Sequence, residues 1–159
     1  MSLAFDTKGV YAKMSKEFKD GVEKLDLIAK KNSAVAVEYA ADFSKSFDYS
    51  ERSIGELEEI LDVYSKDLQV SRPTENQIWS MSVIFGSYLG ETMLKNGLAK
   101  KGYVWGTDGT FPVPLLINES GWRTTPNDKV YKRLVNGSED NVLSYYRVFM
   151  KMVMDEGKF

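Results

Sequence analysis

Glu91 is the residue whose chemistry is least expected from its surroundings in the sequence. It lies in the most apolar stretch of the chain, close to Tyr88 and to several small residues. Burial disfavours the charged form of a carboxyl group unless Lys or Arg pairs with it, and a carboxylate in such a setting can act as a general acid or base. The commoner outcome is an outward-pointing side chain at a crowded helix end, or a structural ion pair with Lys132 or Arg133. Glu91 is therefore the first polar side chain to locate in the structure.

Three cations late in the chain form a second candidate. Lys129 and Arg133 are four residues apart, so on a helix they share a face that can receive a phosphate or a carboxylate, with Lys132 beside them. Their ordinary role would be to complement the negative end of a helix dipole. Nearby aromatic residues could add a stacking surface, although most such residues belong to a core. The candidate ligand-binding residues are Glu91, Lys129, Lys132, Arg133, Tyr88 and Trp105.

The chain of 159 residues contains no Cys and no His. Disulfides, thiolate nucleophiles and Cys-based zinc or iron–sulfur sites are excluded, and so is every mechanism that needs an imidazole of this chain. Walker, Gly-x-Gly-x-x-Gly, EF-hand and Gly-x-Ser-x-Gly motifs are also missing from the sequence. We expect no metal site and no cofactor.

Charge is distributed unevenly along the sequence. The net charge is −2, which is not the basic footprint of a nucleic-acid-binding protein, so a nucleic acid is not the expected partner. From Glu38 to Asp67, nine acids stand against three cations. Such an acidic face could dock a basic protein. It would equally be the solvated side of an amphipathic helix, with Glu51, Glu58 and Asp62 directed away from the apolar residues.

Apolar residues at helical spacing predict three helical segments in the first seventy residues. The first carries an apolar stripe from Tyr11 and is broken or kinked at Asn32-Ser33. The second covers roughly residues 34–43, where Ala favours helix although Val and Tyr also alternate as in a strand. The third begins at Ser50, which is expected to cap it by accepting a hydrogen bond from the backbone.

A fourth helix, from about Glu75 to Lys95, is predicted to be the central element of the fold. It begins with a capping box formed by Thr74 and Gln77. Its apolar residues cover most of its circumference, which is typical of a helix buried on most sides. Small residues at steps of four allow another backbone to approach it closely; they are Ser82, Gly86 and Gly90.

The pattern then changes to strands. Residues 103–105 and 111–117, joined by a tight Asp-Gly turn, predict an antiparallel hairpin, and residues 122–124 suit a third short strand. Pro at a first helical position predicts a helix over residues 126–136, and Ser138 is expected to cap a last helix.

The fold class that these elements predict is α+β and mostly helical. The helices pack around a central apolar helix, a two- or three-stranded antiparallel element comes late in the chain, and residues 1–159 form a single domain. No run reaches the roughly 18 apolar residues of a membrane span, and the N-terminus does not have the pattern of a signal peptide. We therefore expect a cytoplasmic protein that does not bind a membrane.

Several short motifs resemble a family of small bacterial domains of unknown function. The matching pieces span about two thirds of the chain; they are Phe47-Asp48-Tyr49-Ser50 with Ser53-Ile54, Gly86-Ser87-Tyr88-Leu89-Gly90-Glu91, Trp105, and Val130-Tyr131-Lys132-Arg133-Leu134-Val135-Asn136-Gly137 running into Glu139-Asp140. Where the family pattern has Asn-Pro followed by an aromatic residue, this chain has Thr125-Pro126-Asn127-Asp128. The resemblance implies that these segments act together in the fold, and it supplies no activity.

Three functions are consistent with these residues. The first is a protein-interaction module, a cytoplasmic bacterial accessory protein whose partner is another protein, with an immunity-like role as an analogy. The second is a sensor of a small anionic ligand or a nucleotide phosphate, with its site between the hairpin and the Lys129–Arg133 helix. The third is a hydrolase or lyase, free of His and Cys, that uses Glu91 or Asp140 with Tyr88 or Lys132, with or without Mg²⁺.

Overall fold

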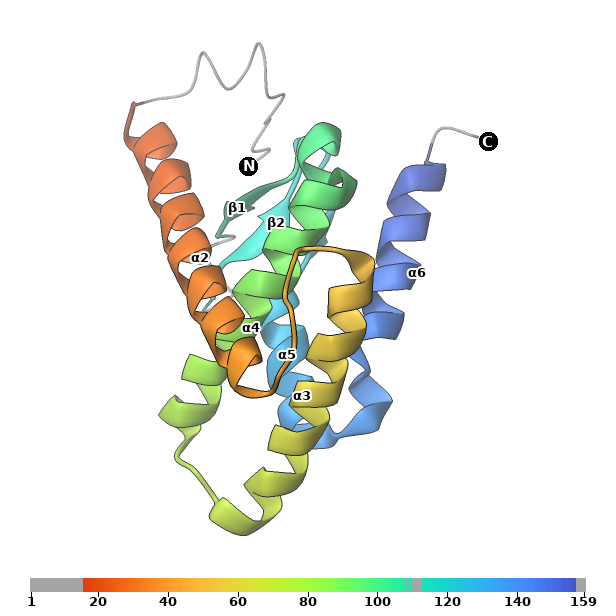
Figure 1. Cartoon of the computed structure of the whole chain (residues 1–159). Coiled ribbons are helices and arrows are strands. Elements are labelled where there is room, and N and C mark those ends of the chain that lie inside the picture. Colours follow the sequence, from red (N-terminus) through yellow and green to blue (C-terminus); the bar gives the residue numbers. More distant parts are fainter. Residues whose placement is uncertain (1–15, 108, 110–112, 157–159) are drawn as a thin grey trace.

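Helical periodicity dominates the chain, and the computed structural model has the predicted α+β, mostly helical class (Figure 1). The structure describes residues 16–107, 109 and 113–156. In this part of the chain the α-helices are α2 (Lys16–Asp42), α3 (Glu51–Ser71), α4 (Glu75–Met93), α5 (Pro126–Asn136) and α6 (Val142–Asp155), and the strands are β1 (Val104–Gly106), β2 (Leu115–Ile117) and β3 (Arg123–Thr124). None of the described helices combines the length and the apolar character that a membrane span requires.

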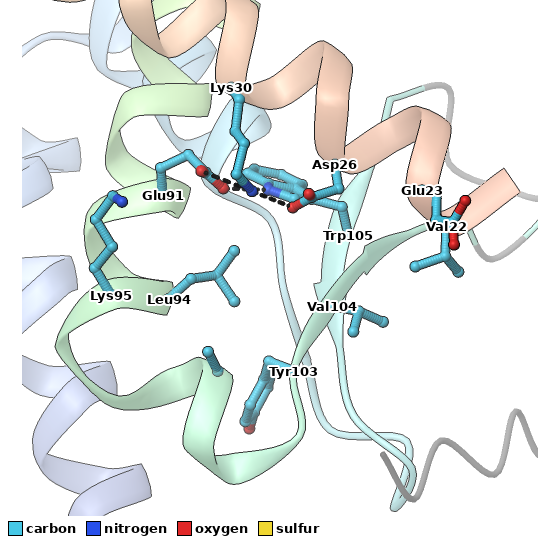
Figure 2. A pocket seen from close by; sticks show the side chains of 11 residues that line it. Val22, Glu23, Asp26, Lys30, Glu91, Leu94, Lys95, Tyr103, Val104 and Trp105 are labelled. Carbon is cyan, nitrogen blue, oxygen red and sulfur yellow. Dashed lines mark hydrogen bonds and ion pairs between the residues drawn. The ribbon is translucent and has the colours of Figure 1, made fainter. Parts of the chain in front are cut away.

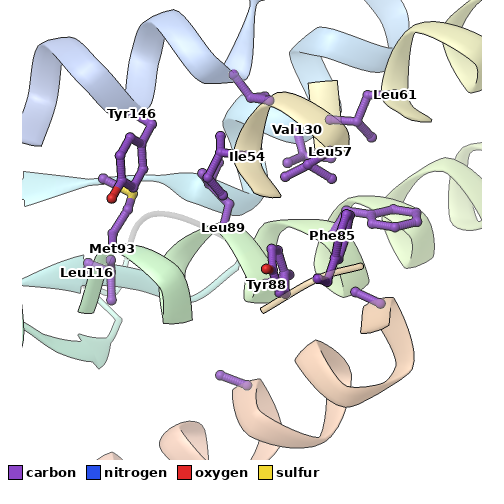
Figure 3. Packing of buried hydrophobic residues seen from close by; sticks show 14 of the residues in the cluster. Ile54, Leu57, Leu61, Phe85, Tyr88, Leu89, Met93, Leu116, Val130 and Tyr146 are labelled. Carbon is purple, nitrogen blue, oxygen red and sulfur yellow. The ribbon is translucent and has the colours of Figure 1, made fainter. Parts of the chain in front are cut away.

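The central position predicted for α4 is confirmed. Every residue from Phe85 to Met93 is buried, and α4 packs against both α2 and α5. Figure 3 shows its apolar side chains meeting those of the surrounding elements. The core contributed by α3, α5, α6 and the sheet includes Ile54, Leu57, Leu61, Val130, Tyr146 and Leu116. Because α4 is covered on several sides, it fixes the places of α2 and α5.

Two glycines allow this close packing around α4. A Cβ at Gly86 would lie 2.5 Å from the Cα of Asn127 at the start of α5. A Cβ at Gly90 would lie 2.4 Å from the ring of Trp105 in β1 and 3.3 Å from Pro126. Contacts this short leave no room for a side chain. The expectation that small residues admit another backbone is confirmed at Gly86, whereas Gly90 admits the ring of Trp105.

The strands form one antiparallel sheet in the order β1-β2-β3, which confirms the hairpin and the third strand. Trp105 pairs with Leu116, and Leu116 pairs in turn with Thr124. The turn that joins β1 to β2 lies partly outside the described residues. The sheet is small, but all three residues of β2 are buried, so it contributes to the core.

Two of the expected helix boundaries are wrong. The break at Asn32-Ser33 does not exist, because α2 continues through it as one helix of 27 residues. The start predicted for the first helical segment lies outside the described residues. Ser33 is buried, and its hydroxyl lies 2.9 Å from the hydroxyl of Tyr49, so a polar residue is accommodated without interrupting the helix. Ser138 does not cap α6 because it begins a short 3-10 turn. Asn141 caps α6 instead, accepting a hydrogen bond from the backbone N–H of Ser144.

The capping predictions at Ser50 and at Thr74 are confirmed, whereas the side chain of Thr125 makes no capping hydrogen bond at the start of α5. Ser50 accepts a hydrogen bond from the backbone N–H of Ser53, and Thr74 and Gln77 form a complete capping box. In front of Ser50, the carboxylate of Asp48 accepts hydrogen bonds from both the hydroxyl and the backbone N–H of that residue. Asp48 therefore fixes the cap that begins α3.

This cap makes the free energy of unfolding depend on pH at acidic pH values. Hydrogen bonds from the hydroxyl and the backbone of Ser50 lower the pKa of Asp48 from 3.8 to about 2. The stabilisation is fully present above the unfolded-state pKa of 3.8 and is lost as the pH falls through 2. We expect Asp48→Asn to lower the free energy of unfolding at pH 6, and the difference from the wild type to shrink as the pH falls from about 4 to about 2. Urea unfolding at a series of pH values measures this difference, and an NMR titration that places the Asp48 midpoint near 3.8 would contradict it.

Candidate functional site

Glu91 is buried at the end of α4, with only 4 % of its side chain exposed. The indole N–H of Trp105 donates a hydrogen bond of 3.0 Å to its Oε2. The ammonium of Lys30 on α2 lies 3.5 Å from its Oε1 and 2.6 Å from Oδ1 of Asp26 (Figure 2). The expectation that Glu91 pairs with Lys132 or Arg133, or points outward, is therefore wrong.

The geometry around Glu91 follows from the residue that precedes it. Because Gly90 has no side chain, the ring of Trp105 lies directly against α4. This contact brings the indole N–H within hydrogen-bonding distance of the carboxylate one residue further along the helix. The Gly-Glu pair and Trp105, which belong to separate motifs in the sequence, thus meet at one point of the fold.

A pocket of about 410 Å³ lies beside Glu91 (Figure 2). It is bounded by one face of α2, by the turns that follow α4 and by the start of β1. The residues of α2 that line it are spaced as one helical face requires. The complete lining consists of Val22, Glu23, Asp26, Lys30, Glu91, Leu94, Lys95, Ala99, Tyr103, Val104 and Trp105.

Carboxylates outnumber ammonium groups in this pocket. The acids of its lining are Glu23, Asp26 and Glu91, and the cations are Lys30 and Lys95. The Lys95 ammonium lies 4.9 Å from the ring centroid of Tyr49, a residue outside the lining, and so is partly engaged there. Burial lowers the pKa of Lys30, but its hydrogen bond to Asp26 and the charge of Glu91 outweigh burial, so the pKa is raised overall and Lys30 stays charged. The local charge favours a cation as the guest.

Tyr88 does not line this pocket, although it lies one turn before Glu91 on α4. Its hydroxyl accepts a hydrogen bond from the backbone N–H of Tyr49 and lies 2.6 Å from the hydroxyl of Ser53. Its ring stacks on Phe47 at a centroid distance of 4.2 Å. Burial raises the pKa of Tyr88, so the phenol stays protonated at neutral pH. Its contacts join the start of α3 to α4.

Arg133 is buried in a different part of the molecule, with 1 % of its side chain exposed. It donates to both carboxylate oxygens of Glu58, and its Nη2 lies 2.8 Å from Oδ1 of Asp62. The expectation that these two acids lie on the solvated side of α3 is therefore wrong for Glu58, whose side chain is only 14 % exposed. Glu58 also accepts a hydrogen bond from the backbone N–H of Val142, which joins α3 to the start of α6.

The two lysines of α5 are also paired with acids. Lys129 lies 2.9 Å from Asp140, and Lys132 lies 3.1 Å from Asp128. The structure therefore brings Glu91 and Trp105 together. It pairs Lys129, Lys132 and Arg133 with acids other than Glu91. An anion at any of these cations would lie close to a carboxylate that repels it.

Sequence reasoning missed Glu23, Asp26 and Lys30, the three charged residues of α2 in the pocket. Their spacing indicates a shared helical face, but nothing in the sequence links that face to Glu91, some sixty residues later. Within residues 16–107, 109 and 113–156, no group of three or more acids is arranged to hold a metal ion.

Comparison of the chain with protein-family models, with curated proteins and with solved structures finds no match. The resemblance to a family of small bacterial domains stays a prediction.

Proposed function

We propose that this protein is an interaction module, and that the pocket beside Glu91 binds a basic side chain, Lys or Arg, of a partner protein. The observation that carries the proposal is a buried carboxylate next to a pocket of about 410 Å³ whose acids outnumber its cations. Two donors among the described residues reach Glu91, the indole of Trp105 and the ammonium of Lys30. Because each carboxylate oxygen can accept two hydrogen bonds, Glu91 can accept a further donor from a guest.

The rest of the lining suits the stem of such a side chain. Lys and Arg bury their methylene groups against apolar surface while the charged head finds polar partners. Val22, Leu94, Val104 and the ring of Tyr103 supply apolar surface in the same pocket as the carboxylates. A guest with an apolar stem and a cationic head matches both parts of the lining.

A protein partner also agrees with the wider properties of the chain. The resemblance is to small bacterial domains, and the proposal includes a location in the bacterial cytoplasm. The size of the chain and the acidic stretch from Glu38 to Asp67, which is separate from the pocket, favour an immunity-like role. In such a role a module of this kind binds a basic partner. The alternative of an anion sensor at α5 has less support, because Lys129, Lys132 and Arg133 already have carboxylate partners.

The test is a titration with small mimics of the two side chains. Nα-acetyl-lysine N-methylamide and its arginine counterpart should bind, and the neutral norleucine compound, which has a similar stem without the ammonium, should not. Heteronuclear NMR follows the indole N–H of Trp105, which should shift because it donates to the carboxylate that receives the guest. Glu91→Gln keeps an acceptor for the indole and removes the charge, so it should weaken binding by at least about tenfold.

The matched control is Glu59→Gln, which removes the same charge from a side chain that is 64 % exposed and outside the pocket. It should leave binding unchanged. Equal binding of the norleucine compound, or an unchanged affinity in Glu91→Gln, would refute the proposal.

A further inference from the structure

The ammonium of Lys30 lies 3.5 Å from Oε1 of Glu91, the carboxylate that a guest cation would contact. We infer that Lys30 is a resident counter-ion that the basic side chain of the partner displaces from Glu91 during binding. This inference rests on the proposed function, and it identifies how the site selects a charged guest. Lys30 then acts as a competitor for the site and not as one of its contacts.

The distances around Lys30 carry this inference. Its Nζ lies 2.6 Å from Asp26 but 3.5 Å from Glu91, so the closer partner is the acid on its own helix. The side chains of Lys30 and Asp26 are 53 % and 45 % exposed, whereas that of Glu91 is 4 % exposed. Lys30 therefore reaches a buried carboxylate from the solvent side, at a distance longer than a well-formed hydrogen bond.

The charges stay balanced when Lys30 leaves. An uncompensated buried carboxylate is costly, and Lys30 provides the compensation while the pocket holds no guest. When a guest ammonium contacts Glu91, Lys30 keeps Asp26 as its partner and moves into solvent, where its side chain is already half exposed. Each state pairs the buried carboxylate with one cation. A neutral side chain cannot make this exchange, because it would leave Glu91 without a counter-charge.

This exchange predicts opposite effects of one substitution on affinity and on stability. Lys30→Met keeps the apolar stem and removes the competing charge, so we expect Nα-acetyl-lysine N-methylamide to bind roughly three- to tenfold more tightly than to the wild type. The same change leaves Glu91 uncompensated in the free protein, so the urea midpoint should fall. Lys31→Met, on the neighbouring exposed position of α2, should change neither quantity.

A second measurement uses the wild-type protein and does not depend on how the variant folds. The NMR signal of the Lys30 ammonium should move toward that of a solvent-exposed lysine as the lysine compound saturates the pocket. Weaker or equal binding by Lys30→Met, or an unmoved Lys30 signal at saturation, would overturn the inference while leaving the proposed function intact. If the compound binds neither the wild type nor Lys30→Met, the proposed function itself fails.

Discussion

Replacing Arg133 with Ala should lower the free energy of unfolding by about 3–5 kcal/mol, the loss expected when one partner of a buried ion pair is removed. Arg133 is 1 % exposed and is held by Glu58 and Asp62 of α3. Without the guanidinium, the mostly buried carboxylate of Glu58 would have only the Val142 N–H as a donor among the described residues. Chemical denaturation of the wild type and the variant measures the difference.

Two further variants make this test specific. Lys132→Ala removes a half-exposed cation of the same helix, paired with Asp128, and should change stability by no more than about 0.5–1 kcal/mol. Arg133→Met combined with Glu58→Gln and Asp62→Asn removes all three charges and keeps an acceptor for Val142, so it should recover much of the loss. An Arg133→Ala protein within 1 kcal/mol of the wild type would show that the buried pair contributes little.

Gly86→Ala should destabilise the protein by roughly 3 kcal/mol, although Ala is the better helix former. The new Cβ would lie 2.2 Å from Oδ1 and 2.5 Å from Cα of Asn127. Asn127 is itself buried at the start of α5, so a backbone atom and not a flexible side-chain end would have to move. We expect α5 to be displaced from α4, with a lower denaturation midpoint as the measured result.

Gly55→Ala is the matched control because Gly55 also lies inside a helix, α3. The nearest atom to its added Cβ is Cδ2 of Leu143 at 3.8 Å, an ordinary contact. The same substitution there should stabilise the protein by about 0.5–1 kcal/mol, since Ala loses less backbone entropy than Gly on folding. Equal effects of the two substitutions would contradict the close approach of α5 to Gly86.

The elements that could be predicted from the sequence are those specified by nearby residues. The apolar circumference of α4, the capping box of Thr74 and Gln77 and the cap at Ser50 each depend on residues within a few positions of one another. The break predicted at Asn32-Ser33 failed because of a distant partner. Ser33 is accommodated inside α2 because Tyr49, sixteen residues later, provides its hydrogen bond.

The candidate site shows the same division. The sequence alone identified Glu91 as an unusual carboxylate and Trp105 as an aromatic residue worth placing, because an acid in an apolar stretch is conspicuous. It could not pair them with each other or with Lys30, and it grouped Arg133 with them although Arg133 belongs with Glu58.

By itself, the sequence determined the mostly helical class, the central helix and the absence of every Cys- or His-dependent chemistry. Only the tertiary structure decided which acid meets which cation. The physical reason is that helical periodicity and capping are local, whereas an ion pair depends on which helix faces are brought together by packing. Because Gly90 has no side chain, the ring of Trp105 can pack against α4 and reach Glu91. The face of α2 that lies toward α4 brings Lys30 to Glu91.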